Sequence, residues 1–283
     1  MSLENFRNIA NQYRRYKAHV SILGTTQLHL RNPYVVAWWS AAFPGFGHLL
    51  LSKYLRGYTL FIWEVVVNIQ ANINTAMVDS FRGKLELTKT DLHPRWMLMY
   101  IPVFIFGIWD AYRTCVDMNN VYLLAEREDA PFNTYTVGAA EINYLDKRSP
   151  VMSTIWSLFM PGLGQLHIHR ILTAFFSLAW SIVFLYQSRL LEAVQLLFLG
   201  DIQASTQVLN PEWLLFMPSI WGFVVYDSYM NTVENNKLFE YEQRAFLIKN
   251  YQSHSFKMKR GKVAVHDPSH VHVRALGETR ISN

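Results

Sequence analysis

Two stretches of the sequence share one pattern, an uncharged apolar run that is interrupted by proline and glycine. Residues 33–51 read PYVVAWWSAAFPGFGHLLL, and residues 150–168 read PVMSTIWSLFMPGLGQLHI. Each run approaches the roughly 20 mostly apolar residues that a membrane-spanning helix needs. Proline lacks a backbone N–H and glycine lacks a side chain, so both runs are predicted to break where these residues occur.

The two stretches lie 117 residues apart, and the same offset relates much of the remaining chain. It aligns Trp39 with Trp156, and far downstream it aligns Asp110 with Asp227. Further identical pairs are Pro33/Pro150, Ser40/Ser157, Leu55/Leu172, Trp63/Trp180, Trp96/Trp213, Tyr112/Tyr229, Asn119/Asn236 and Arg127/Arg244. Because chance rarely preserves one offset over so long a span, the sequence predicts two tandem repeats of about 117 residues.

Apolar residues are concentrated in six segments, three in each repeat. The segments are Tyr34–Leu51, Tyr58–Val78, Trp96–Trp109, Val151–Ile168, Ile171–Ser188 and Trp213–Tyr226. Charged residues make up only 17% of the 283, well below the quarter that is usual in soluble domains. The single cysteine excludes an internal disulfide framework and a multi-cysteine metal site. The predicted fold class is an all-α polytopic membrane protein with four to six spanning segments.

The chain is predicted to divide into two membrane repeats with polar segments around them. The expected parts are a basic amphipathic arm (1–31), repeat A (32–128), a linker (129–148), repeat B (149–248) and a basic tail (249–283) that contains a small β-hairpin. The arm is predicted to form a helix with an apolar side, made of Leu3, Phe6, Ile9, Tyr13, Tyr16 and Val20.

Charge asymmetry places both termini in the cytoplasm but leaves the number of spans open. Six spans put 19 Lys and Arg inside and 7 outside, whereas four spans, with 34–51 and 151–168 only dipping into the membrane, give 21 and 5. Both arrangements satisfy the positive-inside rule. Six spans make the repeats inverted, and four make them parallel.

Each repeat resembles the bacterial TM-two domain, a small helical membrane module. The resemblance rests on the elements PGFGH (44–48) and PGLGQ (161–165), on basic turns at 53–57 and 169–170, and on the endings GIWD (107–110) and GFVVYD (222–227). The family's Phe-Tyr-Leu-Gly-Arg turn is missing from both copies, and residues 79–95 and 189–211 look like insertions. The resemblance implies a membrane module without an assigned reaction.

The helix-break motifs and two aspartates are the first candidate functional residues. The motifs comprise Pro44, Gly45 and Gly47 in repeat A and Pro161, Gly162 and Gly164 in repeat B. Matching breaks in two halves point either to a transporter binding site or to kinks where helices pack closely. Asp110 and Asp227, one in each repeat, are expected either to act at membrane depth or to pair at helix ends with Arg113, Arg56 or Arg170.

A polar stripe and several histidines complete the set. Glu64, Asn68, Asn72, Thr75 and Asp79 follow helical spacing, so they are predicted to share one helix face. That face either lines a wet cavity or bonds to neighbouring helices. His48, His167 and His169 lie near the breaks, and interfacial hydrogen bonding is favoured over metal binding. For His266, His270 and His272, a solvated tail is favoured over metal binding. No metal, cofactor or catalytic residue is predicted.

The expected partners are the lipid bilayer and anionic lipid headgroups. Residues 1–31 carry a net charge of +4 and residues 249–283 carry +5, whereas the middle carries −4. Basic tails beside an anionic membrane explain this distribution, and a nucleic-acid role is disfavoured because no recognised module appears. A membrane-protein partner or a homo-oligomer is also open.

The favoured function is a non-enzymatic multi-pass protein, a scaffold or accessory subunit of the bacterial plasma membrane. The alternatives are a small transporter or channel with its pathway at the repeat interface, and an intramembrane enzyme that uses Asp110 and Asp227.

Overall fold

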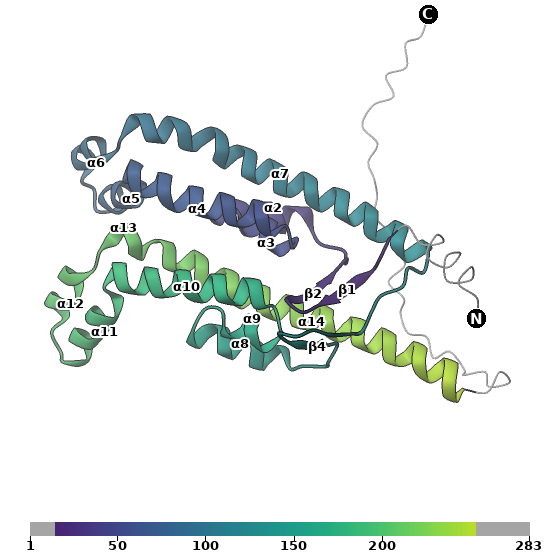
Figure 1. The fold of residues 1–283 in the computed structure, drawn as a ribbon. Coiled ribbons are helices and arrows are strands. Elements are labelled where there is room, and N and C mark those ends of the chain that lie inside the picture. The colour runs from purple at the N-terminus through teal and green to yellow at the C-terminus, as the bar shows by residue number, and fades with distance from the viewer. Residues whose placement is uncertain (1–14, 253–283) are drawn as a thin grey trace, which may run out of the picture. The chain divides into compact units, whose positions relative to one another are not determined.

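The computed structural model describes residues 15–252, and its fold is mostly helical, as the sequence predicted (Figure 1). The described residues up to Tyr241 belong to one compact unit. The last stretch of helix α14, from Glu242, belongs to a second unit.

The helices fall into two matching series. The first series is α2 (Pro33–Ala42), α3 (Phe46–Leu50), α4 (Tyr54–Ala71), α5 (Ile73–Phe81), α6 (Leu85–Asp91) and α7 (Pro94–Arg127). The second is α8 (Pro150–Phe159), α9 (Leu163–His167), α10 (Ile171–Ser188), α11 (Leu190–Phe198), α12 (Ile202–Val208), α13 (Pro211–Leu214) and α14 (Phe216–Tyr251). Helices α8 to α12 begin and end 117 residues after α2 to α6, and α13 begins 117 residues after α7.

Two short antiparallel hairpins precede the helical series. Strands β1 (Ala18–Ser21) and β2 (Gly24–Gln27) pair before α2, and β3 (Tyr135–Val137) and β4 (Ile142–Tyr144) pair before α8. The predicted helix over residues 1–31 is therefore wrong at Val20, which is buried in β1. The turn at Gly24, with φ of 147°, requires glycine and reverses the chain there. Residues 1–14 of the predicted arm and the predicted tail hairpin lie outside the described residues.

The proline-glycine motifs break both uncharged stretches into helical hairpins. Helix α2 has ten residues and α3 has five, and the two pack against each other. Between them Phe43 is extended and Gly45 has φ of 101°, a conformation that other residues rarely adopt. Gly162, with φ of 106°, makes the same break between α8 and α9. A ten-residue helix extends about 15 Å, roughly half the thickness of a bilayer core.

A further break corrects the predicted polar stripe. Asn72 has φ of 55° and ψ of 38°, so it ends α4 in the left-handed conformation and a new helix, α5, starts after it. Glu64 and Asn68 lie on α4, whereas Thr75 and Asp79 lie on α5. The prediction that these residues share one face is wrong, because asparagine tolerates the left-handed conformation and lets the chain turn.

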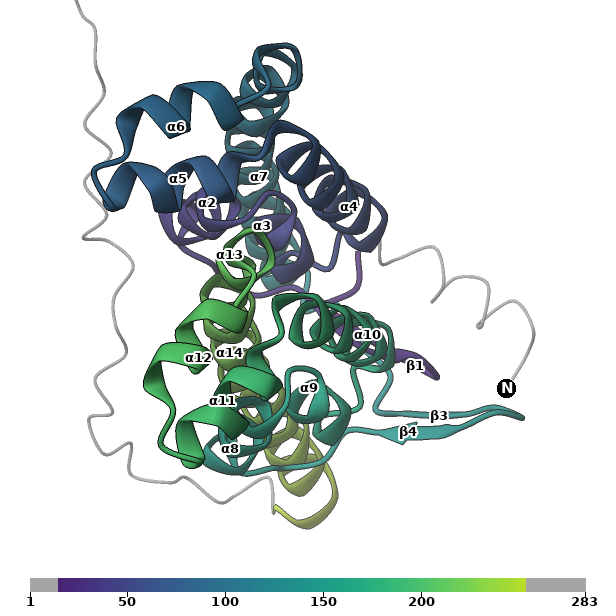
Figure 2. The same cartoon turned by 90° about the vertical axis from the view of Figure 1, so that its left-hand side faces the viewer.

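The core of the first unit is an aromatic cluster to which both helical series contribute. Its buried aromatic members are Trp39, Phe43, Phe46 and Phe61 from the first series and Phe184, Phe216 and Phe223 from the second. Phe223 stacks on Phe46 with ring centroids 4.0 Å apart. Figure 2 looks along the long helices, with α4 and α7 in the upper part of the view and α10 and α14 below them.

Among the described residues, one unbroken helix is long and apolar enough to cross a membrane. It is α10, Ile171–Ser188. The segments Ile202–Val208 and Pro211–Tyr251 pass the same criterion together, but they are bent by 82° at the break between them. The predicted runs at 34–51 and 151–168 form no helix of that length, because their motifs interrupt them.

Candidate functional site

Asp110 forms the first polar cluster with residues of the preceding break and turn. His48, on α3, donates from Nε2 to Asp110 Oδ2 at 2.9 Å. Arg56, at the start of α4, donates from Nη1 to both carboxylate oxygens at 3.0 and 3.3 Å. The side chain of His48 is fully buried, whereas that of Arg56 is 61% exposed. Asp110 therefore links three helices of the first series, α3, α4 and α7.

Asp227 forms the matching cluster in the second series, and it is entirely buried. Arg170 donates from Nη1 to Oδ1 and Oδ2 at 2.7 and 2.6 Å, and the two side chains are 2% and 0% exposed. Asn231 and Gln165 donate to the same carboxylate at 2.8 and 3.3 Å. Arg170 also donates to the Tyr54 hydroxyl of the first series at 3.4 Å.

The two clusters occupy equivalent positions but differ in chemistry. Gln165 stands where the first series has His48, and the basic partner shifts from Arg56 to Arg170. Both aspartates pair with an arginine, as one interpretation of the sequence proposed. The helix-end position that this interpretation assumed is wrong, because Asp110 and Asp227 lie inside the continuous helices α7 and α14. The third candidate partner, Arg113, instead lies 3.6 Å from Asp117 on its own helix. Because each carboxylate has its own cation, the two aspartates act as separate structural pairs.

The break glycines are close-packing positions. A Cβ on Gly45 would lie 2.3 Å from the Gly57 carbonyl oxygen, and one on Gly162 would lie 2.6 Å from the Ala174 carbonyl oxygen. One on Gly47 would lie 2.2 Å from the Ser40 hydroxyl oxygen. Glycine therefore lets each short helix approach the neighbouring helix backbone, which is how small residues promote packing in membranes.

Glu64 and Asn68 belong to a second buried group, at the other end of α4. Asn68 donates to Glu64 Oε1 at 3.0 Å, and the Tyr100 hydroxyl donates to the same oxygen at 3.2 Å. Glu64 is only 4% exposed, and its second oxygen has no protein partner. Asn68 also bonds to Asn74, and Asn72 donates to the Asp91 carbonyl oxygen.

Glu212 joins this group from the second series, and the sequence did not identify it. Its carboxylate accepts from the backbone N–H of Thr75 at 2.7 Å and from the Thr75 hydroxyl at 2.6 Å. Its carbonyl oxygen accepts from Asn74 at 2.8 Å. The residue at the matching position of the first series is Arg95, so the repeat pattern hid this contact.

A charged cavity of about 220 Å³ lies where the first hairpin, α7 and α14 meet. Lys17, Glu126, Glu234 and Lys237 are its charged lining residues. His29 also lines it, and both of its ring nitrogens are buried without a hydrogen-bond partner. Burial, reinforced by nearby cations, lowers the pKa of His29 to about 3. No sequence signal marked His29, since a lone histidine before a helix is unremarkable.

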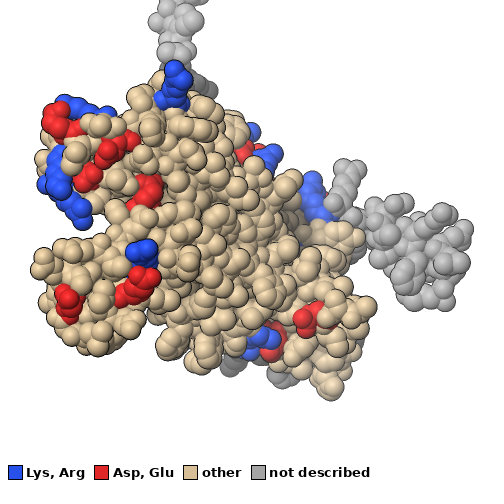
Figure 3. Space-filling model, turned by 60° about the vertical axis from the view of Figure 1, so that its left-hand side comes forward, with Lys and Arg blue, Asp and Glu red and all other residues tan. Residues whose placement is uncertain are grey.

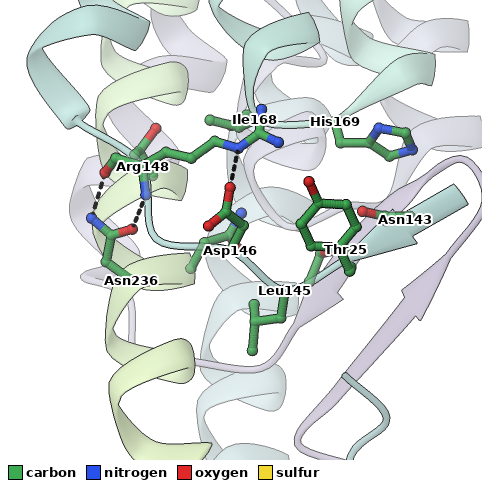
Figure 4. Close-up of a pocket in the computed structure, with 11 residues that line it drawn as sticks. Thr25, Asn143, Leu145, Asp146, Arg148, Ile168, His169 and Asn236 are labelled. Atoms are coloured by element: carbon green, nitrogen blue, oxygen red, sulfur yellow. Dashed lines mark hydrogen bonds and ion pairs between the residues drawn. The ribbon is translucent and has the colours of Figure 1, made fainter. Parts of the chain in front are cut away.

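A smaller hollow, of about 20 Å³, lies at the start of the second series (Figure 4). Arg148 lines it and lies 3.5 Å from Asp146. Asn236 brackets Arg148, accepting from its backbone N–H at 2.9 Å and donating to its carbonyl oxygen at 2.7 Å. Asn119 brackets Arg31 in the same way, at 3.0 and 2.8 Å. A hollow of this size has room for one water molecule and is too small for a substrate. We therefore interpret these hydrogen bonds as structural contacts that hold the segments before α2 and α8 against the long helices.

The remaining histidine candidates bond to the protein backbone or lie elsewhere. His169 Nε2 is 3.0 Å from the Ile22 carbonyl oxygen, and the carbonyl oxygen of His167 accepts from Arg148. Within residues 15–252, no group of three His, Cys, Asp or Glu side chains has a metal-binding arrangement. His266, His270 and His272 lie outside the described residues.

The geometry defines a helical protein with two matching clusters, each of which ties a broken hairpin to a long helix. Comparison of the chain with protein-family models, curated proteins and solved structures found no match. The resemblance to the TM-two domain therefore stays a prediction.

Proposed function

We propose that the chain is a multi-pass membrane protein built as a scaffold or accessory subunit of the bacterial plasma membrane, without enzymatic activity. The observation that carries the proposal is a broad apolar surface on the long helices. Exposed side chains there include Ile101, Ile105 and Trp109 on α7 and Phe175 and Ile182 on α10. On the face that Figure 3 shows, charged side chains lie toward the edges and leave a wide uncharged area between them. A soluble monomer rarely exposes so large an apolar patch.

Helix length, taken without the apolar content that only the unbroken helix α10 also meets among the described residues, favours the four-span arrangement with parallel repeats. Helices α4 and α10 have 18 residues each, which gives about 27 Å, close to the thickness of a bilayer core. Helices α7 and α14 have 34 and 36 residues, so part of each can cross while the rest projects beyond the membrane. The α2–α3 and α8–α9 hairpins are too short to cross, which suits segments that enter and leave on the cytoplasmic side.

The matching helix bounds support a tandem duplication. Backbone details follow the same offset, since Ser52 and His169 share positive φ values of 57° and 58° and Asn72 and Arg189 share 55°. Such values are uncommon in residues other than glycine. Their recurrence at the same offset favours descent from one unit over coincidence.

A scaffold role fits the chemistry of the clusters better than catalysis or transport. Asp227 is neutralised by Arg170 and receives further hydrogen bonds, so it serves the fold as a structural pair. Backbone atoms of the neighbouring helix occupy the space beside the break glycines Gly45 and Gly162. Aromatic side chains pack the contact between the two series. These contacts support the close-packing interpretation of the breaks and give the transporter alternative no support.

Topology mapping tests the proposal. Reporter fusions at residues 54, 86, 135 and 205 are expected to report inside, outside, inside and outside, respectively. A six-span arrangement predicts outside, inside, outside and outside, so three of the four positions discriminate. The full chain is also expected to resist extraction from membranes by alkaline carbonate. Release by carbonate would refute membrane integration, and an outside signal at 135 would refute the parallel arrangement.

A further inference from the structure

We propose that the chain binds a second copy of itself head to tail, through two exposed faces that mirror the contact between its own two halves. This inference rests on the proposed membrane placement and duplication. It identifies the partner as the same chain, whereas lipid is the alternative occupant of those faces.

The internal contact joins different faces of the two halves. Its aromatic part comes from α2, α3 and α4 of the first half and from α10 and α14 of the second, while α5 contacts α13 through Thr75 and Glu212. Trp39 contacts Phe223 and Tyr226, with ring centroids 5.6 and 5.3 Å apart. Tyr58 stacks on Phe176 at 4.1 Å. Here the first half is the first helical series and the second half is the second series. We call the contact surface of the first half, around Trp39 and Tyr58, the socket face. We call the contact surface of the second half, around Phe176, Phe223 and Tyr226, the plug face.

Each half also carries the equivalent of the face that the other half uses. The plug residues Phe176, Phe223 and Tyr226 correspond, 117 positions earlier, to Thr59, Phe106 and Trp109. The socket residues Trp39 and Tyr58 correspond, 117 positions later, to Trp156 and Phe175. The first half therefore has an unused plug face, and the second half has an unused socket face.

Part of each unused face is exposed where its counterpart is buried. Phe223 is 1% exposed and Phe106 is 52% exposed. Trp39 is 7% exposed and Trp156 is 43% exposed. An isologous contact would use the same faces of both halves, whereas this heterologous contact leaves one of each kind free. The free pair can join another copy in the same way, so the association can extend or close into a ring.

A groove on the unused plug face adds a shape argument. It measures about 440 Å³ and is lined by Leu55, Arg56, Thr59, Leu60, Phe106 and Asp110. Thr59 lines the groove and corresponds to Phe176 on the plug face of the second half. Because threonine is smaller than phenylalanine, the unused plug face is hollow at this position. In the internal contact Phe176 meets Tyr58, so in the external contact Thr59 meets the counterpart of Tyr58, which is Phe175. The side chain of Phe175 is 58% exposed, and the groove has room for it.

The same geometry predicts the aromatic pairs of the new interface. Trp156 is placed against Phe106 and Trp109, as Trp39 is against Phe223 and Tyr226. Association of helices inside a membrane depends on such close packing, because lipid already satisfies apolar surface. A matched plug and socket supply packing that flexible lipid chains do not.

Thiol cross-linking in membranes tests the head-to-tail contact. Two tagged forms of the full chain, Phe106→Cys and Trp156→Cys, are co-expressed in a Cys115→Ala background and treated with a short bifunctional thiol reagent. A cross-linked pair that carries both tags is expected, with at least a tenfold lower yield when either variant is expressed alone. Val183→Cys serves as the control partner and is expected to give no more than background, because Val183 (38% exposed) and its counterpart Val66 (49% exposed) both lie outside the internal contact.

The outcomes separate this proposal from the proposed function. Chain that stays in the carbonate-washed membrane but gives no mixed pair overturns head-to-tail association and leaves the membrane proposal standing; lipid then covers both faces. Equal cross-linking of Phe106→Cys alone points to an isologous contact, and equal yield with Val183→Cys points to random collision. Either result overturns the proposal. The mass of the detergent-extracted wild-type chain gives an independent measure, with a multimer expected and a monomer contradicting it.

Discussion

Replacing the break glycine Gly45 by alanine is the sharpest test of how the hairpins are built. Gly45 has φ of 101°, and a Cβ there would lie 2.3 Å from a backbone carbonyl oxygen of α4. The strained backbone costs about 1–3 kcal/mol. The overlap adds about 1–3 kcal/mol, since backbone cannot move aside as a flexible side chain can. Gly45→Ala is therefore expected to lower the free energy of unfolding by roughly 2–6 kcal/mol.

Gly83→Ala is the matched control. Gly83 also has a positive φ, 75°, but a Cβ there would meet nothing within 4 Å. Its cost is the conformational strain alone, about 1–2 kcal/mol. Thermal or denaturant unfolding of the detergent-purified chain compares the two variants with wild type. If Gly45→Ala destabilises the chain no more than Gly83→Ala, the close approach of α3 to α4 does not exist as described and the reasoning fails.

Three further predictions concern the arginine–aspartate pairs, His29 and the aromatic core. Arg170→Leu leaves the Asp227 carboxylate buried without its cation and is expected to cost about 3–5 kcal/mol, whereas Arg56→Leu, at a mostly exposed arginine, is expected to cost about 1 kcal/mol or less. Stability is expected to fall by about 1.4 kcal/mol per pH unit below pH 6.5, because the unfolded chain protonates His29 while the folded chain, with a pKa of about 3, keeps it neutral. His29→Gln removes that component. Phe223→Ala empties a fully packed aromatic site and is expected to cost about 3–5 kcal/mol.

All three are measured by unfolding in one detergent, with controls chosen from equivalent positions. Equal losses for Arg170→Leu and Arg56→Leu would contradict the difference in burial between the two ion pairs. Parallel pH profiles for wild type and His29→Gln, between pH 6.5 and 4.5, would show that His29 protonates as readily in the folded chain. Phe106→Ala, at the exposed counterpart of Phe223, is expected to change monomer stability little, and a loss equal to that of Phe223→Ala would contradict the assignment of buried and open faces.

The local features of the fold were predictable because single residue types determine them. The Pro-Gly pairs at 44–45 and 161–162 end a helix because proline lacks a backbone N–H and the glycine adopts a positive φ, so both breaks were found at the correct places. Proline alone does not suffice, since Pro102 lies inside the continuous helix α7. The break at Asn72 was missed, because asparagine only permits the left-handed conformation and helical spacing favoured a continuous stripe. The hairpin at residues 18–27 was also missed, although Gly24 gave a local signal for a turn.

The contacts that join the two halves could not be predicted from the sequence, because they depend on how the halves pack. Glu212 and Tyr54 bind partners more than 100 residues away, and nothing in their local sequence marks them. The repeat pattern suggested that equivalent residues have equal roles. Asp110 and Asp227 are equivalent in that each pairs with an arginine. They differ in the burial of that pair, because the first half covers the Asp227 cluster and nothing within residues 15–252 covers Arg56 in the same way.

The difference in burial between the two clusters follows from the heterologous contact. Asp227 lies on the plug face that the first half covers, so Arg170 and Asp227 are sealed and Tyr54 completes the arginine's hydrogen bonds. Asp110 lies beside the unused plug face, so Arg56 remains 61% exposed. If a second copy covers that face, Arg56 and Asp110 become buried in turn. Arg56→Leu is therefore expected to spare the monomer while it lowers the cross-linking yield between Phe106→Cys and Trp156→Cys. An unchanged yield would show that the open cluster takes no part in the association.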